Sequence, residues 1–272
     1  MSGQTFIFCV GATKAGTSWL YDYLNSHPEC QLPAVKELHY FDALEHGSGK
    51  WHRKQLEERL EGVRARLATV DNPRPHQKRL LADGEAWLNA FDGETRDDAA
   101  YLQFIRKSSG DAKLIGDFTP AYGMLKEATF RAMAGLTDKV RFVYLMRDPV
   151  ERIWSNIRMV AGHEGRAALE VKIKGVLDGT AVNILERSNY RRTLNRLSAA
   201  LPRQMFHIEF YERLFTPEAI ARLCAFLGIT PEPAQYDRVV HRSVSADLPA
   251  AQRAQLQAAL KPQYNFGREV HG

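Results

Sequence analysis

The sequence predicts a three-layer α/β domain in which a central, mostly parallel sheet is flanked by helices. Two segments, starting at Thr5 and at Lys139, each consist of a strand, a tight turn and a helix, and further strands and helices alternate around them. Such alternation is typical of a parallel sheet, because a helix must carry the chain back before the next strand can run in the same direction. The 272 residues are 44% hydrophobic and 25% charged, as in ordinary globular proteins. We expect one domain, spanning residues 1–272.

The first of these units lies at the N-terminus. Residues 5–10 form a short apolar run closed by Gly11, which is the pattern of a strand buried on both faces at the centre of a sheet. Residues 17–25 carry apolar side chains at helical spacing, and Pro28 follows. Because the residue before a proline disfavours the helical conformation, the helix should end there.

The second unit lies in the middle of the chain. Residues 139–146 are rich in strand-forming apolar side chains, and residues 147–149 form a turn that ends in proline. Proline is favoured at the first position of a helix, so a helix is expected over residues 150–160. The same architecture therefore occurs twice.

Weaker patterns fill the rest of the chain. We expect strands at residues 113–116 and 204–210, and helices at residues 122–133 and 217–227. Residues 43–110 differ, because Lys, Arg, Glu and Gln are densely interspersed among Leu and no strand pattern occurs. This stretch predicts helices laid over the sheet as a cover.

Charge and cysteine content narrow the functional classes only partly. The net charge of +5 would suit an anionic ligand, a nucleic acid or an acidic membrane surface. The three cysteines are widely spaced, which favours neither a disulfide framework nor a metal knuckle. With no secretory leader and no run of eighteen apolar residues, we expect a cytoplasmic protein without an integral membrane segment.

A glycine-containing loop joins the first strand to the first helix. It reads Gly-Ala-Thr-Lys-Ala-Gly-Thr-Ser over residues 11–18, at a place where backbone N–H groups and the helix dipole favour an anion such as phosphate. Lys14 precedes the second glycine, whereas a Walker A loop ends in Gly-Lys-Ser/Thr, so this is not an NTPase loop. The alternative is that the glycines only make a turn and Lys14 is solvated.

A second cationic motif follows the strand at residues 139–146. Arg147 stands at the strand end and Ser155 lies one to two turns into the next helix, so both side chains can face one anion. Ligands of open α/β sheets collect at the carboxyl ends of strands, and Arg147 and Lys14 should therefore converge on one crevice. Alternatively, Arg147 pairs with Asp148 or Glu151 at the helix start.

Two candidate bases occur in the segment Lys-Glu-Leu-His-Tyr-Phe-Asp at residues 36–42. Glu37 and His39 are two residues apart, so in an extended segment their side chains point the same way. Either could take a proton from an acceptor hydroxyl. The alternative is a charged edge segment with its apolar side chains packed below.

Taken together, these motifs resemble those of the sulfotransferases that use 3′-phosphoadenosine 5′-phosphosulfate (PAPS). Residues 11–20 look like their 5′-phosphosulfate loop, and residues 144–155 look like their 3′-phosphate site. Residues 36–42 and 116–122 are similar to segments of the heparan sulfate sulfotransferases and of many bacterial relatives. The resemblance implies a P-loop-like fold and sulfuryl transfer from PAPS, which leaves adenosine 3′,5′-bisphosphate as the product.

The resemblance also implies roles for individual residues. The 5′-phosphosulfate would be held by residues of the first loop, and the 3′-phosphate by Arg147 and Ser155, with Arg242 as a further nucleotide contact. The residues of the first loop are Lys14, Ala15, Gly16, Thr17 and Ser18. Glu37 would be the general base and His39 an auxiliary that orients the acceptor, while Lys14 and Ser155 assist the transfer.

One position departs from the pattern of the related polysaccharide enzymes. They commonly carry a lysine directly before Thr-Pro-x-Tyr, and here that residue is Phe118. Phenylalanine cannot contact a charged acceptor as lysine could, which argues against a polysaccharide. The acceptor is left open as a small molecule, a saccharide or a lipid headgroup, and the accepting group as a hydroxyl or, as the second choice, an amine.

Two other functions compete with sulfuryl transfer. A P-loop-type nucleotide or small-molecule kinase would need a Walker A lysine beside Ser/Thr, which is absent. A nucleic-acid-binding protein would show clustered Lys and Arg with aromatic platforms, whereas acidic residues are interspersed almost everywhere in this chain. No His/Cys cluster with metal-ligand spacing occurs along the sequence, so no metal is expected.

Overall fold

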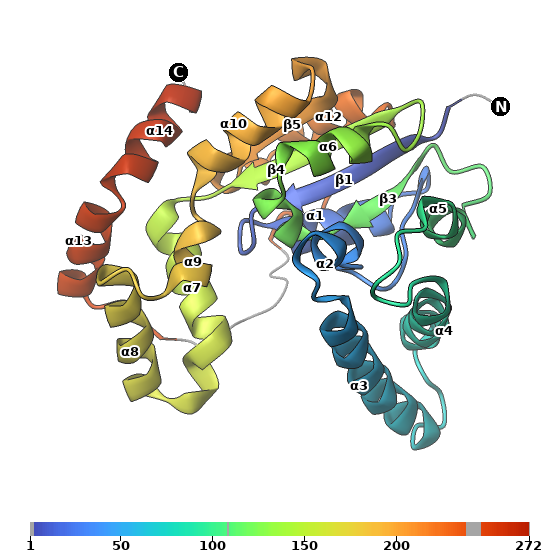
Figure 1. Cartoon of the computed structure of the whole chain (residues 1–272), viewed down its shortest axis with the longest axis horizontal. Coiled ribbons are helices and arrows are strands. Elements are labelled where there is room, and N and C mark those ends of the chain that lie inside the picture. Colours follow the sequence, from blue (N-terminus) through green and yellow to red (C-terminus); the bar gives the residue numbers. More distant parts are fainter. Residues whose placement is uncertain (1–2, 108, 238–245, 272) are drawn as a thin grey trace.

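A five-stranded parallel sheet forms the centre of the molecule in the computed structural model, which describes residues 3–107, 109–237 and 246–271 (Figure 1). The strand order is β2-β3-β1-β4-β5, and every neighbouring pair is parallel. The strands are β1 (Thr5–Gly11), β2 (Cys30–Gln31), β3 (Leu114–Phe118), β4 (Val140–Met146) and β5 (Phe206–Phe210). The predicted α/β class is therefore confirmed.

Strand β1 lies at the middle of the sheet, as its apolar run predicts. All seven of its residues are buried, because strands lie on both sides of it and helices cover both faces. The ring of Phe8 stacks on Phe142 of β4 at 5.4 Å between centroids. On the other side β3 approaches closely, since a Cβ at Gly116 would meet the carbonyl oxygen of Ile7 at 2.0 Å. Glycine is therefore required there.

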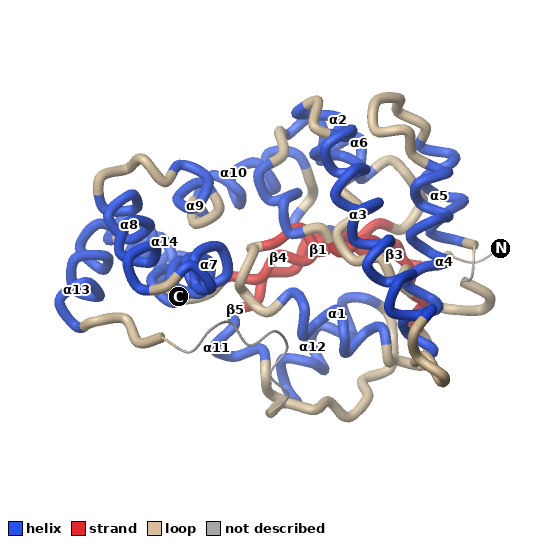
Figure 2. The backbone as a smooth tube through the Cα atoms, turned by 90° about the horizontal axis from the view of Figure 1, so that it is seen from below, coloured by secondary structure: helices blue, strands red, loops and turns tan. Residues whose placement is uncertain are grey.

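Helices cover both faces of the sheet and complete three layers (Figure 2). Helices α1 and α12 lie on one face, and α6 and α10 lie on the other. Their bounds are α1 (Thr17–Asn25), α6 (Glu127–Ala134), α10 (Tyr190–Ala200) and α12 (Pro217–Leu227). The bounds of α1 and α12 are those that the sequence predicts.

The segment 43–110 is helical, as predicted, but only part of it lies against the sheet. Helix α5 packs on β3, whereas α3 and α4 pack on each other as a hairpin that projects away from the sheet (Figure 1). The helices are α2 (Tyr40–His46), α3 (Gly49–Ala68), α4 (Pro75–Ala90) and α5 (Asp98–Arg106). Most side chains of α3 are exposed, so this helix does not cover a hydrophobic core. Residues of its first half line a cavity instead.

A second hydrophobic cluster lies beside the sheet and is built around α7. Ile153 and Ile157 of α7 are completely buried there, together with Leu256 of α13. The helices of this region are α7 (Pro149–Ala161), α8 (Arg166–Leu177), α9 (Val182–Glu186), α13 (Ala250–Ala259) and α14 (Lys261–His271). The remaining short helices are η1 (Pro120–Met124), η2 (Gly162–Glu164), η3 (Arg203–Met205) and α11 (Tyr211–Leu214).

The prediction of one helix over residues 122–133 is wrong. The chain instead forms the 3₁₀ helix η1, turns at Leu125 in an extended conformation, and then begins α6. The cause is contact with β1, because a Cβ at Gly123 would lie 2.8 Å from the carbonyl oxygen of Val10. The Gly123 carbonyl also accepts a hydrogen bond from Thr193 Oγ1 at 2.8 Å. These contacts fix the segment after β3 against the sheet before a helix can start.

Candidate active site

A cavity of about 1540 Å³ collects the predicted site residues at the carboxyl ends of β1 and β4. Glu37 and His39 line it together with residues of both cationic motifs. The lining residues from those motifs are Lys14, Gly16, Thr17, Ser18, Arg147 and Ser155. Ala15 is completely buried and its N–H donates to the carbonyl oxygen of Ala12 at 3.1 Å, which places it behind the loop. Arg242 lies outside the described residues.

The loop after β1 presents the N-terminus of α1 to this cavity. Lys14 and Gly16 both have positive φ angles, of 69° and 95°, and Gly16 is the N-cap of α1. Because glycine has no side chain with which to cap the helix, the first N–H groups of α1 are left for a ligand. A Cβ at Gly16 would also lie 3.0 Å from the ring of Tyr211, so only glycine fits there.

Positive charges gather around this helix start. Lys36 Nζ donates to Ser18 Oγ at 2.7 Å. Burial and the neighbouring charges of Arg147 and Arg158 lower the pKa of Lys14 below its usual value. Like charges held close together disfavour their own charged forms unless an anion lies between them. The group is therefore suited to a ligand with several negative charges.

Arg147 lies at the end of β4 and faces the loop. Its Nη1 donates to the carbonyl oxygen of Lys14 at 3.2 Å, and its guanidinium lies over the ring of Tyr211, 4.3 Å from the centroid. The alternative pairing with Glu151 exists but is loose, at 3.9 Å between Arg147 Nη2 and Glu151 Oε2. Glu151 has a closer partner in Arg253, at 2.6 Å. The guanidinium of Arg147 therefore stays available to a ligand.

The last turn of α7 adds a second arginine that sequence reasoning missed. Arg158 follows Ser155 by three residues and lines the same cavity, since residues three apart share a helix face. Among the described residues, Arg147 and Arg158 each have a buried Nε without a hydrogen-bond partner. Buried donors are rarely left unpaired, and here both belong to side chains at the cavity.

Glu37 and His39 meet at the cavity, but not through an extended segment. Both residues have positive φ angles, of 67° and 52°, so the predicted extended geometry is wrong. The chain turns at each of them, and His39 becomes the N-cap of α2. His39 Nε2 lies 3.7 Å from Glu37 Oε2, while His39 Nδ1 lies 2.7 Å from Asp42 Oδ2. The imidazole therefore lies between two carboxylates.

Charges around the two side chains set their protonation states. Burial raises the pKa of Glu37, but the neighbouring positive charges of His39, Lys36 and Arg187 outweigh it and lower the pKa to about 2. Burial lowers the pKa of His39, but Asp42 and Glu37 outweigh it and raise the pKa to about 9. At neutral pH the pair is a carboxylate and an imidazolium. Of the two, only Glu37 is then able to accept a proton.

The end of β3 holds this segment in place. Tyr122 Oη donates to Asp117 Oδ2 at 2.8 Å and accepts the backbone N–H of Tyr40 at 3.0 Å. Burial raises the pKa of Asp117 to about 6, although hydrogen bonds from neighbouring hydroxyls oppose the shift. A buried carboxylate thus anchors the first turn of α2 through one tyrosine.

Phe118, where related enzymes have lysine, is buried. Its ring meets Tyr21 edge to face at 5.6 Å, and its carbonyl oxygen accepts the N–H of Glu37 at 3.1 Å. The side chain belongs to the core, while the backbone positions the candidate base. Because phenylalanine replaces lysine at position 118, this position contributes no positive charge to the cavity.

Two arginines, one buried and one half-buried, contact Thr13 in the loop after β1, and neither role was predicted from the sequence. Arg152 is fully buried and donates to Ser188 Oγ at 2.7 Å and to the carbonyl oxygen of Ile184 at 2.6 Å. Arg187 Nη1 donates to Thr13 Oγ1 at 2.9 Å. The only sequence clue was the place of Arg152 inside the motif at residues 147–155. Both arginines tie α9 to the cavity.

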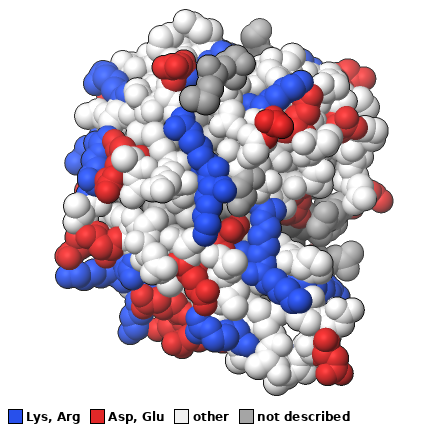
Figure 3. Space-filling view, turned by 90° about the vertical axis from the view of Figure 1, so that its right-hand side faces the viewer, with Lys and Arg blue, Asp and Glu red and all other residues white. Residues whose placement is uncertain are grey.

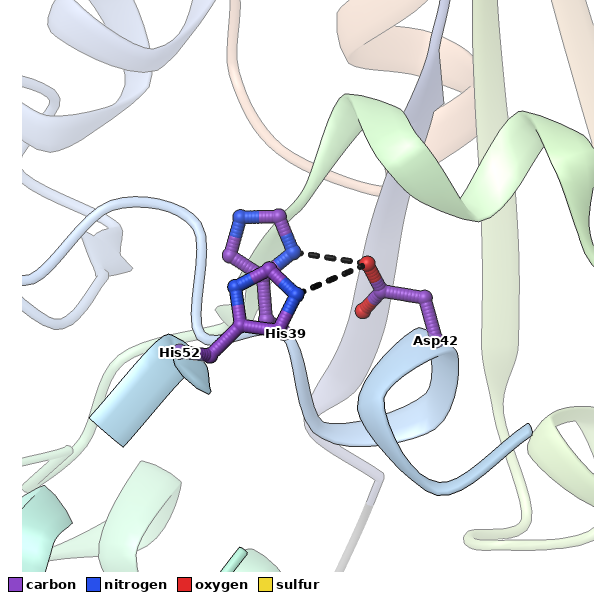
Figure 4. A group of neighbouring side chains, drawn as sticks. All are labelled: His39, Asp42 and His52. Atoms are coloured by element: carbon purple, nitrogen blue, oxygen red, sulfur yellow. Dashed lines mark hydrogen bonds and ion pairs between the residues drawn. The ribbon is translucent and has the colours of Figure 1, made fainter. Parts of the chain in front are cut away.

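Among the described residues, His39, Asp42 and His52 form a group with the atom types and proximity of a metal site (Figure 4). The sequence expectation that no such cluster exists missed it, because His52 comes from α3. Imidazole nitrogens bind metals in the plane of the ring, whereas these two rings stack at 3.9 Å with only 17° between their planes. One ion could not lie in the planes of both nearly parallel rings without displacing the hydrogen bond between His39 Nδ1 and Asp42 Oδ2, so the arrangement as it stands does not fit an ion.

The fold and cavity define an α/β protein in which cationic side chains gather at the start of a helix and a carboxylate lies beside them. A family model described as "Sulfotransferase family" matches residues 7–233. The chain therefore belongs to the sulfotransferase family.

The chain is also similar to individual sulfotransferases. Carbohydrate sulfotransferase 15 of Mus musculus is 25% identical over 175 residues, which are 55% of this chain but only 26% of that protein. A crystal structure of a sulfotransferase from Alicyclobacillus acidocaldarius matches with a TM-score of 0.62 and 18% identity over 96% of this chain and 93% of that one. The sulfotransferase domain of the Synechococcus PCC 7002 olefin synthase matches with a TM-score of 0.52 and 17% identity, over 98% and 94%. These structural matches show the fold.

The charged side chains on one face of the molecule are of mixed sign. On the face shown in Figure 3, Lys and Arg side chains are interspersed with Asp and Glu and with neutral surface. Such a mixture differs from the basic stripe of a nucleic-acid-binding face. None of the described helices is long and apolar enough to span a membrane.

Proposed function

We propose that this chain transfers the sulfuryl group of PAPS to a hydroxyl group of an acceptor. The observation that carries the proposal is that one cavity holds two cationic sites and the Glu37–His39 pair. PAPS, when bound, supplies an activated sulfuryl group next to a phosphate leaving group. The residues of this chain must bind both ends of the nucleotide and take the proton of the acceptor.

Two groups of residues would hold the nucleotide. The N-terminus of α1, with Lys14 and the Lys36–Ser18 pair, suits the 5′-phosphosulfate. Arg147, Ser155 and Arg158 suit the 3′-phosphate, and the unpaired Nε atoms of the two arginines support this fit. Each charge-assisted hydrogen bond to a phosphate oxygen contributes about 1.5–3 kcal/mol.

Glu37 is the proposed general base. Its carboxylate accepts the proton of the acceptor hydroxyl as the oxygen–sulfur bond forms and the bond from sulfur to the phosphate oxygen breaks. His39, held as an imidazolium by Asp42, keeps the carboxylate oriented and adds positive charge to the site. Lys14 and Lys36 stabilise the negative charge that develops on the departing phosphate oxygen. The chain requires no metal for these steps.

The acceptor is proposed to be a neutral saccharide or another small hydroxylated molecule. The likeness to a carbohydrate sulfotransferase supports the saccharide. Trp51 of α3 lines the cavity and is 60% exposed, so it offers a flat apolar face to an acceptor. The burial of Phe118, where a lysine would meet a charged polymer, argues for the neutral class.

Thermal unfolding with nucleotides tests the proposal. Adenosine 3′,5′-bisphosphate should raise the Tm of the chain far more than ATP, which lacks a 3′-phosphate. A hundredfold excess over the Kd corresponds to about 2.7 kcal/mol of stabilisation. Arg147→Ala should weaken the binding of the bisphosphate at least tenfold, since it removes one charge-assisted hydrogen bond or more. Arg166→Ala, at a side chain 83% exposed on α8, is the matched control.

Equal stabilisation by ATP and the bisphosphate would contradict the proposed donor. Transfer itself is then measured by mass spectrometry, with purified protein, PAPS and panels of saccharide and non-saccharide alcohols. An acceptor that gains one sulfuryl group while PAPS is converted to the bisphosphate supports the proposal. Turnover of ATP in the same assay would instead favour a kinase.

A further inference from the structure

His52 brings a second imidazole to the candidate base, from a part of the chain that carries none of the family motifs. It lies in the first turn of α3 and lines the cavity. Its ring stacks on that of His39 at 3.9 Å between centroids, with 17° between the planes. Both rings face the same carboxylate oxygen of Asp42, at 2.7 Å from His39 Nδ1 and 4.0 Å from His52 Nε2 (Figure 4).

The end of α3 that carries His52 is fixed, while the rest of the helix is largely exposed. Gly49 and Gly93 are in backbone contact, since a Cβ at Gly49 would fall 1.8 Å from the carbonyl oxygen of Gly93. Arg53 donates to the carbonyl oxygens of Leu88 and Phe91 at the end of α4. His52 lies between these two anchors. Its position is therefore set by the backbone of the hairpin and not by its own contacts alone.

Charge decides which of the two imidazoles holds a proton. Two imidazolium rings face to face would repel each other, so the stack accommodates one proton. Asp42 lies within hydrogen-bond distance of His39 and not of His52. Burial and the charge of His39 lower the pKa of His52 to about 4. At neutral pH, His52 is thus an uncharged flat ring against a charged one.

The ring of His52 also has an aromatic neighbour. Trp51, the preceding residue, meets it edge to face, at 4.8 Å between centroids and 79° between the planes. Asp42 holds the His39 ring only at Nδ1, so the ring can still rotate about this hydrogen bond. The stack on His52 removes this freedom because it fixes the plane of the ring.

We propose that His52 is a positioning residue that holds the imidazolium plane of His39, so that His39 Nε2 stays directed at Glu37. The inference rests on the proposed sulfuryl transfer, in which Glu37 is the base. It also gives the α3–α4 hairpin a role, because the anchored end of α3 supplies the ring that positions His39 beside Glu37. The role belongs to the ring face of His52 and not to its nitrogens.

Two substitutions separate the ring face from the nitrogens. His52→Phe keeps a flat ring and removes the nitrogens, whereas His52→Ala removes both. With PAPS saturating, His52→Ala should lower kcat about tenfold or more, as expected when a catalytic group is misplaced. His52→Phe should retain most of the wild-type kcat, and neither variant should change the Kd of adenosine 3′,5′-bisphosphate. His76→Ala, at an exposed histidine of α4, is the matched control.

Histidine NMR on the full-length protein gives a readout that needs no turnover. The ring proton signals of His39 should carry a ring-current shift in the wild type and in His52→Phe, and should lose it in His52→Ala. If this contrast is present but no acceptor is sulfated, the proposed function fails and the positioning role stands. His52→Gln, which keeps a polar group but no ring, replaces the alanine variant if that variant does not fold.

Three results would overturn the inference. The first is an unchanged kcat and an unchanged His39 signal in His52→Ala. The second is a loss in His52→Phe as large as in His52→Ala, which would mean that a ring nitrogen is required. The third is stoichiometric binding of Zn²⁺ by the wild type that His52→Ala abolishes, which would make His52 a metal ligand.

Discussion

The two halves of the cavity are built in different ways. On the proposed nucleotide side, Lys14, Gly16 and Arg147 lie just beyond the ends of the neighbouring strands β1 and β4, and Ser155 lies in α7, the helix that follows β4. On the proposed acceptor side, the Glu37–His39 pair is held by Asp117 through Tyr122 and contacts His52 of a projecting hairpin. One half is fixed by the sheet itself, whereas the other is assembled from distant segments.

This difference predicts that substitutions on the two sides separate binding from catalysis. A residue at a strand end keeps its place through the hydrogen bonds of the sheet, so its loss should remove one contact to the nucleotide. A residue of the acceptor side is held by side-chain contacts, so its loss should disturb its neighbours as well. Rates should therefore respond to the acceptor side, and nucleotide affinity to the strand ends.

The largest effect is expected for Glu37→Gln. The amide cannot accept the proton of the acceptor, and loss of a general base lowers rates by roughly 10²- to 10⁴-fold. Nucleotide affinity should change far less than the rate, because the Glu37 carboxylate, 3.7 Å from His39 and 3.6 Å from Lys36, is itself an anion and cannot bind a phosphate. The measurement is kcat at saturating PAPS, with the Kd of adenosine 3′,5′-bisphosphate determined separately.

His39→Asn is the comparison for this experiment. This substitution removes the imidazolium but leaves the Glu37 carboxylate, so kcat should fall less in His39→Asn than in Glu37→Gln. If Glu37→Gln kept most of its activity while His39→Asn lost it, the two roles would have to be exchanged. That outcome would also show that the neighbouring carboxylates do not keep His39 protonated during turnover.

A smaller effect is expected when the His39 proton is titrated. The pKa of His39 is raised from 6.5 to about 9, so its pairing stabilises the folded state fully below pH 6.5 and this contribution is lost as the pH rises through about 9. The free energy of unfolding of the wild type should fall over this range more than that of His39→Asn. Chemical denaturation at several pH values measures it, and parallel curves would contradict the assignment.

The sequence predicted the strand ends well because their contacts are local. The apolar run of β1, the glycine at the start of α1 and the arginine after β4 are each read within a dozen residues, and parallel strands bring their carboxyl ends together. The bounds of α1 and α12 followed from the same short-range patterns. The place of a side chain at the end of a strand or a helix can therefore be predicted from one short segment of the sequence.

The acceptor side was predicted less well because it depends on contacts between distant segments. Nothing in the sequence places His52 on His39 or Arg187 on Thr13, which is 174 residues away. The left-handed conformations of Glu37 and His39 also went unpredicted, since non-glycine residues rarely adopt them. Tertiary contacts such as the carbonyl of Phe118 on Glu37 N–H hold that conformation.

The smallest effect is expected from removal of metal ions. His39, Asp42 and His52 have the side-chain types of a metal site, but the stacked rings direct their nitrogens in parallel and His39 Nδ1 is already engaged with Asp42. Turnover should therefore be the same with and without EDTA, and Zn²⁺ or Mg²⁺ should not increase it. Initial rates on protein dialysed against the chelator test this. If the chelator abolished turnover and one of these ions restored it, the acceptor side would be organised by an ion rather than by contacts between α2 and α3.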